Sequence, residues 1–356
     1  MDNRLQGHFD NAKSENNQTT SMKGFDSEFT DIVDYIKRIT YRIWEGKQIG
    51  LCYDYYSEDC PVYTLAGVCA GYKVVTENTI KTLASFPDRT LHADNIIWGG
   101  DDNEGYHSSH LISTHMTNLG DSEYGPATGK KAVIHVIAHC IVKDNQIIEE
   151  WLVRDNYALC QQLGYDPIEV AKKNALSEQD SATRQWFESE IKRLKGSASK
   201  PRSPVVYEDS NPEGLVRSIL QNVWNAKLFG DIFLAYAEDA RLYTTRKRQL
   251  NGHTEILQFY IEILSTLSDL NFSIDYVCSN SPTSNTDVAV RWSLVGKHTH
   301  LGMFGPATNE DILIIGESHY QIVNGKIYQE WTVFDEVAVL TQVERARLKK
   351  NSCIEN

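Results

Sequence analysis

The stretch Glu149-Glu150-Trp151-Leu152-Val153-Arg154-Asp155 returns almost unchanged, 180 residues later, as Gln329-Glu330-Trp331-Thr332-Val333-Phe334-Asp335. At the same offset, Gly125-Pro126-Ala127-Thr128 matches Gly305-Pro306-Ala307-Thr308. Further identical pairs are Trp44 and Trp224, Lys47 and Lys227, Tyr56 and Tyr236, Tyr63 and Tyr243, and His139 and His319. So many identities in one register indicate a tandem duplication, which has to be found before other fold signals are interpreted.

Length and composition agree with two globular units. The chain has 356 residues, and its 35 basic and 48 acidic side chains give a formal net charge of −13. This length predicts about two domains, each large enough to enclose its own core. Excess negative charge repels phosphate backbones and anionic membranes, so we expect neither nucleic acid nor membrane as a partner. The seven cysteines are odd in number and contain no Cys-x-x-Cys pair, which favours reduced thiols in a cytoplasmic protein.

Each half begins with helical periodicity and continues with strand-like segments. In the first half, helices are predicted over 29–46, in a short piece after 50, and over 73–86, and strands over 92–98, 106–116, 131–142 and 146–156. The second half repeats the plan with helices over 214–227 and 254–267 and strands over 271–277, 287–300, 311–323 and 326–337. Helices followed by an antiparallel meander indicate an α+β fold.

The same patterns predict the domain boundaries. They are a disordered lead-in over 1–28, a first domain over 29–173, a charged helix and linker over 174–211, a second domain over 212–343, and a polar tail over 344–356. The lead-in is polar and has no apolar core of signal-peptide length.

Three motifs of the first half, Tyr124-Gly125-Pro126-Ala127-Thr128-Gly129-Lys130, Glu150-Trp151-Leu152-Val153-Arg154-Asp155 and Gln161-Gln162-Leu163-Gly164, resemble the SnoaL-like polyketide cyclase family. That family has the nuclear transport factor 2-like fold. The resemblance is weaker over 212–343, where the Gln-Leu-Gly is missing. It implies two tandem cone-shaped domains, each a bent antiparallel sheet wrapped by about three helices around a pocket. It also implies a sheet-to-sheet intrachain pseudo-dimer and leaves further homo-oligomers open.

The resemblance assigns the chemistry to Asp155. In the cyclase members, the Asp of the Trp-x-x-x-Asp motif is the general acid/base that removes a proton next to a carbonyl group. An apolar cone raises the pKa of such a carboxyl toward the working pH. If strand alternation continues through the motif, Trp151 and Asp155 share the pocket face, and Glu150 and Arg154 lie on the outer face. The alternative is that Asp155 only caps the segment that begins at Tyr157.

Histidines on the neighbouring strands are candidate proton donors. Counting back from the Asp144-Asn145 turn places His139 opposite Glu150, away from Asp155 unless a bulge shifts the register. His110 and His115 are candidates for stabilising an enolate oxygen. For His139, a buried histidine satisfied by a neighbour is the alternative. No metal-ligand spacing is present, so we expect neither a metal nor a cofactor.

The remaining candidates are aromatic residues and second-half counterparts. Substrate-binding candidates, with a core position as the alternative for most, are Trp44, Tyr56, Tyr63, Trp98 and Trp151. Second-half counterparts are His298, His319, Trp331, Asp335 and Arg291. With a three-residue shift in register, His298 corresponds to His115 and Arg291 to Ser108. The second half then has fewer pocket histidines, which favours the first half as the active one.

The sequence therefore predicts a cofactor-independent enzyme that applies acid/base chemistry to a small carbonyl-containing or cyclic metabolite. The reaction classes are isomerisation, cyclisation, dehydration and hydrolysis. One alternative is a non-catalytic ligand-binding or scaffold protein of the same fold, since one fold hosts many functions. Another is a metal-dependent hydrolase.

Overall fold

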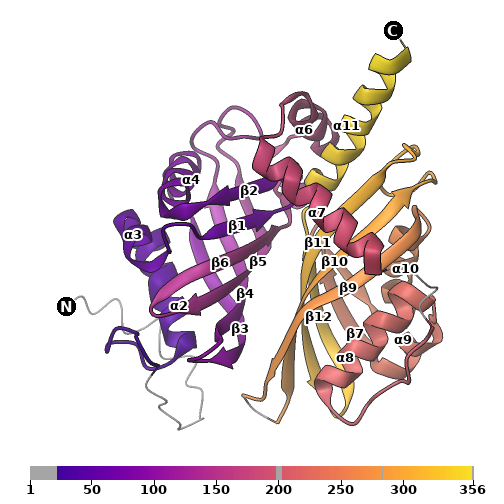
Figure 1. Cartoon of the computed structure of the whole chain (residues 1–356), viewed down its shortest axis with the longest axis horizontal. Helices are drawn as coiled ribbons and strands as arrows, with labels where there is room; N and C mark the ends of the chain where they lie inside the picture. The colour runs from indigo at the N-terminus through magenta and orange to yellow at the C-terminus, as the bar shows by residue number, and fades with distance from the viewer. Residues whose placement is uncertain (1–21, 198–202, 283, 355–356) are drawn as a thin grey trace.

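The computed structural model describes residues 22–197, 203–282 and 284–354, with side chains to residue 351. The duplication appears as two α+β halves, each with a six-stranded sheet and its own helices (Figure 1). Most of the predicted lead-in, residues 1–21, lies outside the described residues, as do 198–202 of the linker and the last two residues of the tail. Residues 22–28 are packed on the first half, where Met22 is buried and the Phe25 ring meets Tyr35 edge-on at 5.2 Å.

The first half opens with the predicted amphipathic helix. Asp31 caps α2 (Ile32–Thr40) by accepting a hydrogen bond from the Asp34 backbone N–H over 2.8 Å, and α2 buries Ile32, Ile36 and Ile39. The helix continues as a π-helical turn, η1 (Tyr41–Glu45). The other helical elements before the long strands are η2 (Ile49–Leu51), α3 (Cys52–Tyr55) and α4 (Gly71–Ser85). These elements cover one face of the sheet and enclose the first cone (Figure 1).

The first sheet has the strand order β2-β1-β6-β5-β4-β3. Its strands are β1 (Pro61–Thr64), β2 (Gly67–Ala70), β3 (Thr90–Asp101), β4 (Gly105–Thr117), β5 (Lys131–Lys143) and β6 (Gln146–Arg154). The four long strands form the predicted antiparallel meander. The sheet is mixed, however, because β1 pairs with β6 in parallel, a long-range pairing that local sequence patterns do not reveal.

The second half repeats this topology, with the order β8-β7-β12-β11-β10-β9. Its helical elements are α8 (Pro212–Leu220), η3 (Gln221–Ala226), α9 (Gly230–Ala235) and α10 (Gly252–Leu264). Its strands are β7 (Tyr236–Thr244), β8 (Arg248–Asn251), β9 (Leu267–Asn280), β10 (Thr286–His298), β11 (Asp311–Val323) and β12 (Lys326–Phe334). Even the π-helical turn recurs, η3 in the place of η1.

Four helices connect or close the two halves: α5 (Asn156–Leu163), α6 (Pro167–Leu176), α7 (Ser181–Ser197) and α11 (Glu336–Ile354). Helix α7 crosses from one half to the other (Figure 1). Near its start, Thr183 Oγ1 accepts from the Val68 N–H of β2 over 3.1 Å, and at its end Asn271 Nδ2 of β9 donates to Ser197 Oγ over 2.9 Å. The tail predicted from residue 344 is helical up to 354, because α11 continues and packs beside α6.

Strand β10 is equivalent to β4, and β11 to β5, at an offset of 180 residues without a shift. Strands β3 and β9 are equivalent at an offset of 181 residues. Tyr106 pairs with Val142 in the first half, and Thr286 pairs with Ile322 in the second. The predicted three-residue shift is therefore wrong. His298 corresponds to Asn118, not to His115, and both residues hold the threonine of the Gly-Pro-Ala-Thr turn. The two corresponding pairs are Asn118 Oδ1 with the Thr128 N–H at 2.9 Å and His298 Nδ1 with Thr308 Oγ1 at 3.2 Å.

The two sheets pack against each other through the faces that point out of the cones (Figure 1). His107 stacks on Tyr276 with ring centroids 3.9 Å apart. At the pair of positions related to these by the duplication, Asn95 Nδ2 donates to Asp287 Oδ2 over 3.0 Å. The contact thus has approximate twofold symmetry with different chemistry on its two sides. The halves pair with each other within one chain.

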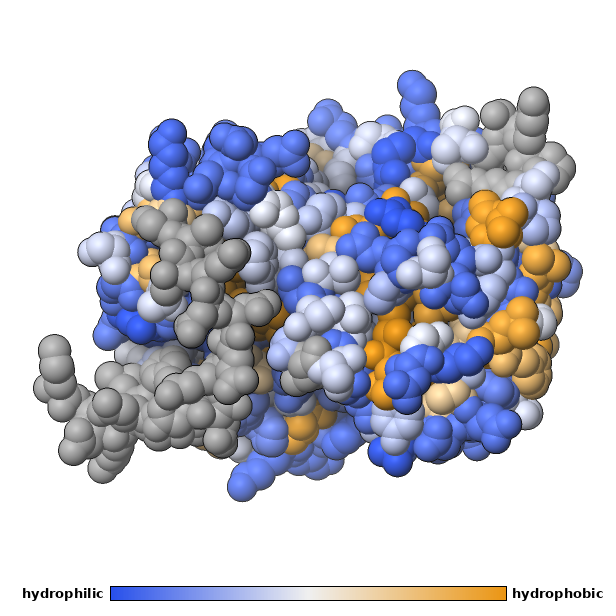
Figure 2. All heavy atoms as spheres, turned by 90° about the horizontal axis from the view of Figure 1, so that it is seen from below, coloured by the Kyte–Doolittle hydropathy of each residue, from blue (hydrophilic) through white to orange (hydrophobic). Residues whose placement is uncertain are grey.

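The outer surface shows no membrane-crossing element among the described helices, none of which is long and apolar enough to span a bilayer. The face in Figure 2 is mostly hydrophilic, with apolar side chains in small separate groups. Six of the seven cysteines, those with described side chains, are free thiols. No three His, Cys, Asp or Glu side chains gather as a metal-ion site within the described residues.

Candidate active site

The inner face of the first cone is the opposite face of β6 from the one predicted. Glu150, Leu152 and Arg154 line the cone, while Trp151 faces the second half. The predicted assignment is wrong because β6 ends at Arg154, and Asp155 leaves the strand alternation as the N-cap of α5. Because Asp155 lies outside the strand, its position gives no information about which face of β6 carries Trp151.

A bulge also changes the partner of His139. Val142 pairs with Ile147 and Ile141 pairs with Glu149, so Ile148 is an extra residue in β6. His139 consequently pairs with Trp151, and Cys140 pairs with Glu150. The expectation that His139 lies opposite Glu150 holds only for a hairpin without a bulge.

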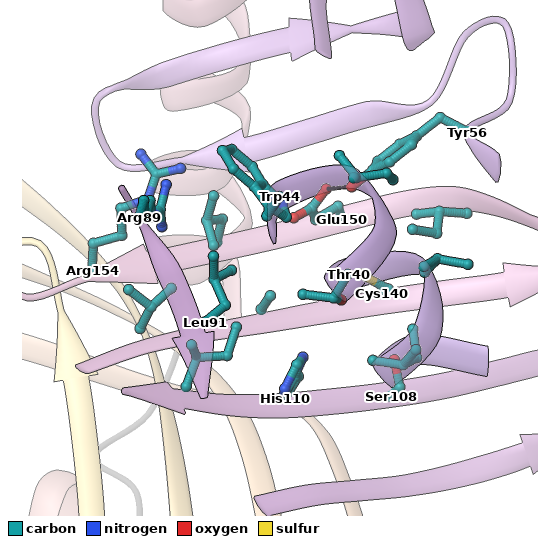
Figure 3. Close-up of a pocket in the computed structure, with 18 residues that line it drawn as sticks. Thr40, Trp44, Tyr56, Arg89, Leu91, Ser108, His110, Cys140, Glu150 and Arg154 are labelled. Atoms are coloured by element: carbon teal, nitrogen blue, oxygen red, sulfur yellow. Dashed lines mark hydrogen bonds between the residues drawn. The ribbon is translucent and has the colours of Figure 1, made fainter. Parts of the chain in front are cut away.

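The first cone encloses a cavity of about 80 Å³ between α2, η1 and strands β3 to β6. Figure 3 shows the polar groups that converge on it. Arg89 and Arg154 lie at one end beside Trp44, and Glu150 lies with Tyr56 on the same side of the cavity. His110 reaches up from β4 on the opposite side. A cavity of this size accommodates a small molecule or the reactive end of a larger one.

Glu150 is a buried carboxyl with a single hydrogen bond from a described side chain. Only 8% of the residue is exposed, and its Oε2 accepts from the Tyr56 hydroxyl over 3.1 Å. Burial raises the pKa of Glu150 to about 7, against the lowering effects of the Tyr56 hydrogen bond and the Arg154 charge. Near neutral pH, this carboxyl is therefore able both to take up and to release a proton, which suits a general acid/base.

Two polar atoms of β4 on the inner face have no hydrogen-bond partner in the described structure. They are Nε2 of His110 and Oγ of Ser108, both buried and two residues apart on one face of the strand. Burial lowers the pKa of His110 to about 3, so its imidazole is neutral at physiological pH. Buried polar atoms are nearly always hydrogen-bonded. Two such orphans beside a cavity are the groups that a ligand oxygen satisfies.

Two arginines lie at the other end of the cavity. Arg89 is 5% exposed, its Nε donates to Thr114 Oγ1 over 3.0 Å, and its guanidinium lies 4.7 Å from the Trp44 ring centroid. Nε of Arg154 is buried without a hydrogen-bond partner among the described residues. Burial, and then the charge of Arg154, lower the pKa of Arg89 to about 9, so it remains protonated at neutral pH.

In the second half, aromatic side chains occupy the equivalent space. Trp292 and Phe272 stand where the first half has Ile112 and Leu91, and Phe334 stands in place of Arg154. The Trp224 ring stacks on Phe272 at 5.4 Å, and Phe272 meets Trp292 at 5.4 Å. The second cone also lacks the His110 imidazole, because Val290 holds that position.

Gly316 leaves room for the Trp292 indole in the second cone. It stands in place of Val136, and a Cβ atom at Gly316 would collide with the Trp292 indole. The second cone therefore has an aromatic core where the first has a cavity. This arrangement favours the first half as the candidate site, on different grounds from the predicted three-residue register shift.

The structure does not bring Asp155 to the cavity. Its carboxylate accepts from the Ala158 N–H over 3.1 Å, and from the backbone N–H groups of Arg246 and Lys247 in the second half over 3.0 and 2.9 Å. Burial raises the pKa of Asp155 to about 6. Asp335 is similar, because it caps α11 through the Ala338 N–H at 3.1 Å and accepts from Asn156 Nδ2 at 2.6 Å. Both aspartates join a helix start to the other half.

His139 and His319 lie between the two sheets, not in a cone. His139 Nε2 is 3.0 Å from His107 Nδ1, and His319 Nε2 is 2.8 Å from Ser109 Oγ. Ser109 also donates to the buried Glu317 over 3.1 Å. Burial lowers the pKa of both His139 and His319. The satisfied buried histidine, one of the two predicted alternatives, describes His139.

The other predicted residues divide between the sheet interface and the surface. Tyr63 stacks on Trp151 at 5.3 Å, and Tyr243 stacks on Trp331 at 5.4 Å, at equivalent positions. The Arg291 guanidinium lies 3.3 Å from the Trp151 ring centroid. Trp98 packs on Tyr106, and the exposed His115 contacts His92. Among the predicted candidates, the cavity brings together Trp44, Tyr56 and His110.

A second hollow of about 500 Å³ lies between the halves, beneath α7. Tyr63, Trp151 and Arg291 are part of its lining. Several of its charges are already paired, since Arg193 lies 3.1 Å from Asp275 and 2.6 Å from Glu190. Nε of Arg291, which lines this hollow, also has no hydrogen-bond partner among the described residues. The first cone differs in that its carboxyl, Glu150, is buried and has a pKa raised to about 7.

The sequence-based prediction missed Glu150, Ser108, Arg89 and Arg154 as cavity residues. One signal was available for Glu150 and Tyr56: both are identical in the two repeats, and the structure shows that they bond to each other. No such signal exists for the two arginines, because Leu270 and Phe334 replace them in the second half.

Comparisons with known proteins agree with this fold. The sequence matches the family described as SnoaL-like polyketide cyclase over residues 35–163 and 214–343. The similar solved structures include TsrD from Streptomyces laurentii, with 16% identity, a TM-score of 0.33, and coverage of 37% of this chain and 94% of that one. They also include IdmH from Streptomyces antibioticus, with 17% identity, a TM-score of 0.31, and coverage of 35% and 92%. No curated protein matches the chain. Because both halves match the family and together make up most of the sequence, the chain belongs to the SnoaL-like polyketide cyclase family.

Proposed function

We propose that the first cone is an acid/base site that moves a proton at the carbon next to a carbonyl group of a small molecule. One observation carries this proposal. The carboxyl of Glu150, with its pKa near 7, lines the same cavity as the two unpartnered polar atoms of His110 and Ser108. A base and oxyanion donors lining one buried cavity are the parts that such a reaction needs.

The proposed step balances within the cavity. Ionised Glu150 takes the proton from the carbon, the C–H bond breaks, and its electron pair moves into the carbonyl group to form an enolate. N–H of neutral His110 and O–H of Ser108 donate to the enolate oxygen, where charge develops. Glu150, now protonated, returns the proton to the same or another carbon. A neutral imidazole suits the donor role because it does not give its proton away entirely.

The family supports this reaction class, and the class includes isomerisation and ring closure through an enolate. Asp155 was expected to be the base, but its carboxylate is engaged by three backbone N–H groups at the junction of the halves. We therefore transfer the role to Glu150. Tyr56 is then a positioning residue, because it holds one oxygen of Glu150 and leaves the other free of described hydrogen bonds.

The test uses the full chain in deuterium oxide with a panel of small ketones, oxo acids and enones. Proton NMR follows the loss of the C–H signal next to each carbonyl group. We expect accelerated exchange for at least one class, and loss of that acceleration in Glu150→Gln. Binding of panel members without any acceleration would contradict the proposal and favour a ligand-binding protein.

A further inference from the structure

We propose that Arg89 and Arg154 form a subsite for a carboxylate, so that the molecule bound in the first cone is a small organic acid. This inference deepens the proposed function and rests on it for the identity of the reacting end. Arg89 and Arg154 lie at one end of the cavity that Glu150, His110 and Ser108 also line (Figure 3). In this proposal the arginines hold the carboxylate, and the carbonyl group of the same molecule is directed to the other three residues.

The first support is the absence of a counter-ion. Within the described part of the chain, no carboxylate oxygen lies within 4.0 Å of a side-chain nitrogen of either arginine. The neighbouring Asp88 does not pair with either arginine. Its carboxylate accepts hydrogen bonds from the Thr117 N–H over 2.7 Å and from the Thr117 hydroxyl over 2.6 Å. Arg89 is buried and Arg154 is partly buried, and a buried charge without a partner is costly, more so beside a second charge of the same sign. A bound anion removes that cost.

The second support is the placement of the two guanidinium groups. Both line the cavity, and Figure 3 shows them near each other at one end. Arg89 is held from behind by Thr114 and by the face of Trp44, so its orientation is fixed before a ligand arrives. Nε of Arg154 has no partner among the described residues. Planar, fixed guanidinium groups match the two oxygens of a carboxylate.

The third support comes from the second half of the same chain. Asn271 of the second half is equivalent to Thr90 of the first, so Leu270 stands in place of Arg89. Phe334 stands in place of Arg154. Both arginines are thus exchanged for apolar residues in the half whose cone is filled with aromatic rings. The same topology forms without them, so the fold does not require this pair. Arginines at these positions occur together with the cavity.

The experiment titrates the full-length protein with propanoate, with its uncharged isostere propanamide, and with inorganic phosphate, using isothermal titration calorimetry at neutral pH. We expect propanoate to bind at least about tenfold more tightly than propanamide, because hydrogen bonds to charged groups are the stronger ones. Arg89→Leu and Arg154→Phe copy the second half, and each should remove this preference. Arg291→Leu, at an arginine outside the cavity, is the matched control and should keep it.

Three results would overturn the proposal: equal binding of propanoate and propanamide, binding of phosphate but not propanoate, or full propanoate binding in both arginine variants. The first comparison needs no variant, so it stands even if a substitution disturbs folding. Glu150→Gln separates this inference from the proposed function. It should retain propanoate binding while losing proton exchange. Loss of carboxylate preference with intact Glu150-dependent exchange would reject the subsite alone.

Discussion

The hydroxyl of Tyr56 donates to Oε2 of Glu150 over 3.1 Å, and this is the only hydrogen bond to that carboxyl from the described side chains. In the second half, the same pair is closer, at 2.6 Å, and Thr332 holds the other oxygen of Glu330. Leu152 stands in place of Thr332 and offers no hydroxyl. The same Tyr–Glu pair therefore occurs in both cones. In the second cone both carboxyl oxygens of the glutamate accept a side-chain hydrogen bond, and in the first cone only one does.

Tyr56→Phe tests what this hydrogen bond does. The bond to Tyr56 opposes the rise in the pKa of Glu150 that burial causes. Without it, that pKa should rise, and the activity that depends on ionised Glu150 should appear at higher pH. We expect the midpoint of the pH–rate profile to move upward by about one unit. Tyr236→Phe should leave the profile unchanged. A Tyr56→Phe profile that stays in place or moves down would show that Tyr56 does not tune the base.

Asp155→Ala separates a structural role from a chemical one. The substitution removes a helix cap and leaves two amides of the second half without their acceptor. We expect the free energy of unfolding to fall by about 2 to 4 kcal/mol, with the exchange rate per folded molecule retained. Asp166→Ala is the matched control, since Asp166 caps α6 through one hydrogen bond to Ile168 at 2.8 Å. It should cost about 1 kcal/mol. Lost activity with unchanged stability would restore Asp155 as the base.

Glu317 gives a prediction for stability against pH. Burial raises the pKa of this carboxyl to about 8 in the folded protein, from 4.5. Between these values, the folded state keeps a proton that the unfolded chain has released, so stability falls as pH rises through the window. The lowered pKa values of His139 and His319 act in the opposite direction, but only below about 6.5, where the unfolded histidines are charged.

The window from about pH 6.5 to about pH 8 therefore isolates the carboxyls. In urea unfolding, the free energy of unfolding should fall by on the order of 1 kcal/mol per pH unit for each buried carboxyl that titrates in this window. Glu317→Gln should reduce the slope and leave the part due to carboxyls such as Glu150, whose pKa of about 7 lies in the same window. Glu178→Gln, at an exposed carboxyl, should leave the slope unchanged. A slope in this window that is the same in both variants would show that Glu317 is ionised in the folded protein.

Local patterns were sufficient for helix α2, the long strands and the duplication, but they did not predict β2, α9, β7 or β8. The apolar spacing of α2, the four long strands and the Asp144-Asn145 turn all lie where the sequence places them. These features depend on short-range periodicity, which survives in each copy. The parallel pairing of β1 with β6 depends on contacts far apart in sequence, and the residues of β1 alone do not encode it.

The site was harder to predict because a single residue changes the facing of a strand. The extra residue Ile148 moves His139 from Glu150 to Trp151, and nothing in the hairpin sequence marks the bulge. The prediction for Asp155 was wrong for another reason. Its place in the motif suggests a strand residue, but the structure has it as the N-cap of α5. The unpartnered arginines were invisible, since pairing is a property of the fold and not of the sequence.

Glu150→Gln compared with Glu330→Gln is the most direct test of the proposed base. Both substitutions remove a buried carboxyl that bonds to a tyrosine, one in each cone. The measurement is the rate of deuterium exchange next to the carbonyl group of the fastest-exchanging panel compound, in each variant at matched folded concentration. We predict a loss of roughly a hundredfold or more for Glu150→Gln and a near-normal rate for Glu330→Gln. Equal rates in the two variants would contradict the assignment of Glu150 as the base.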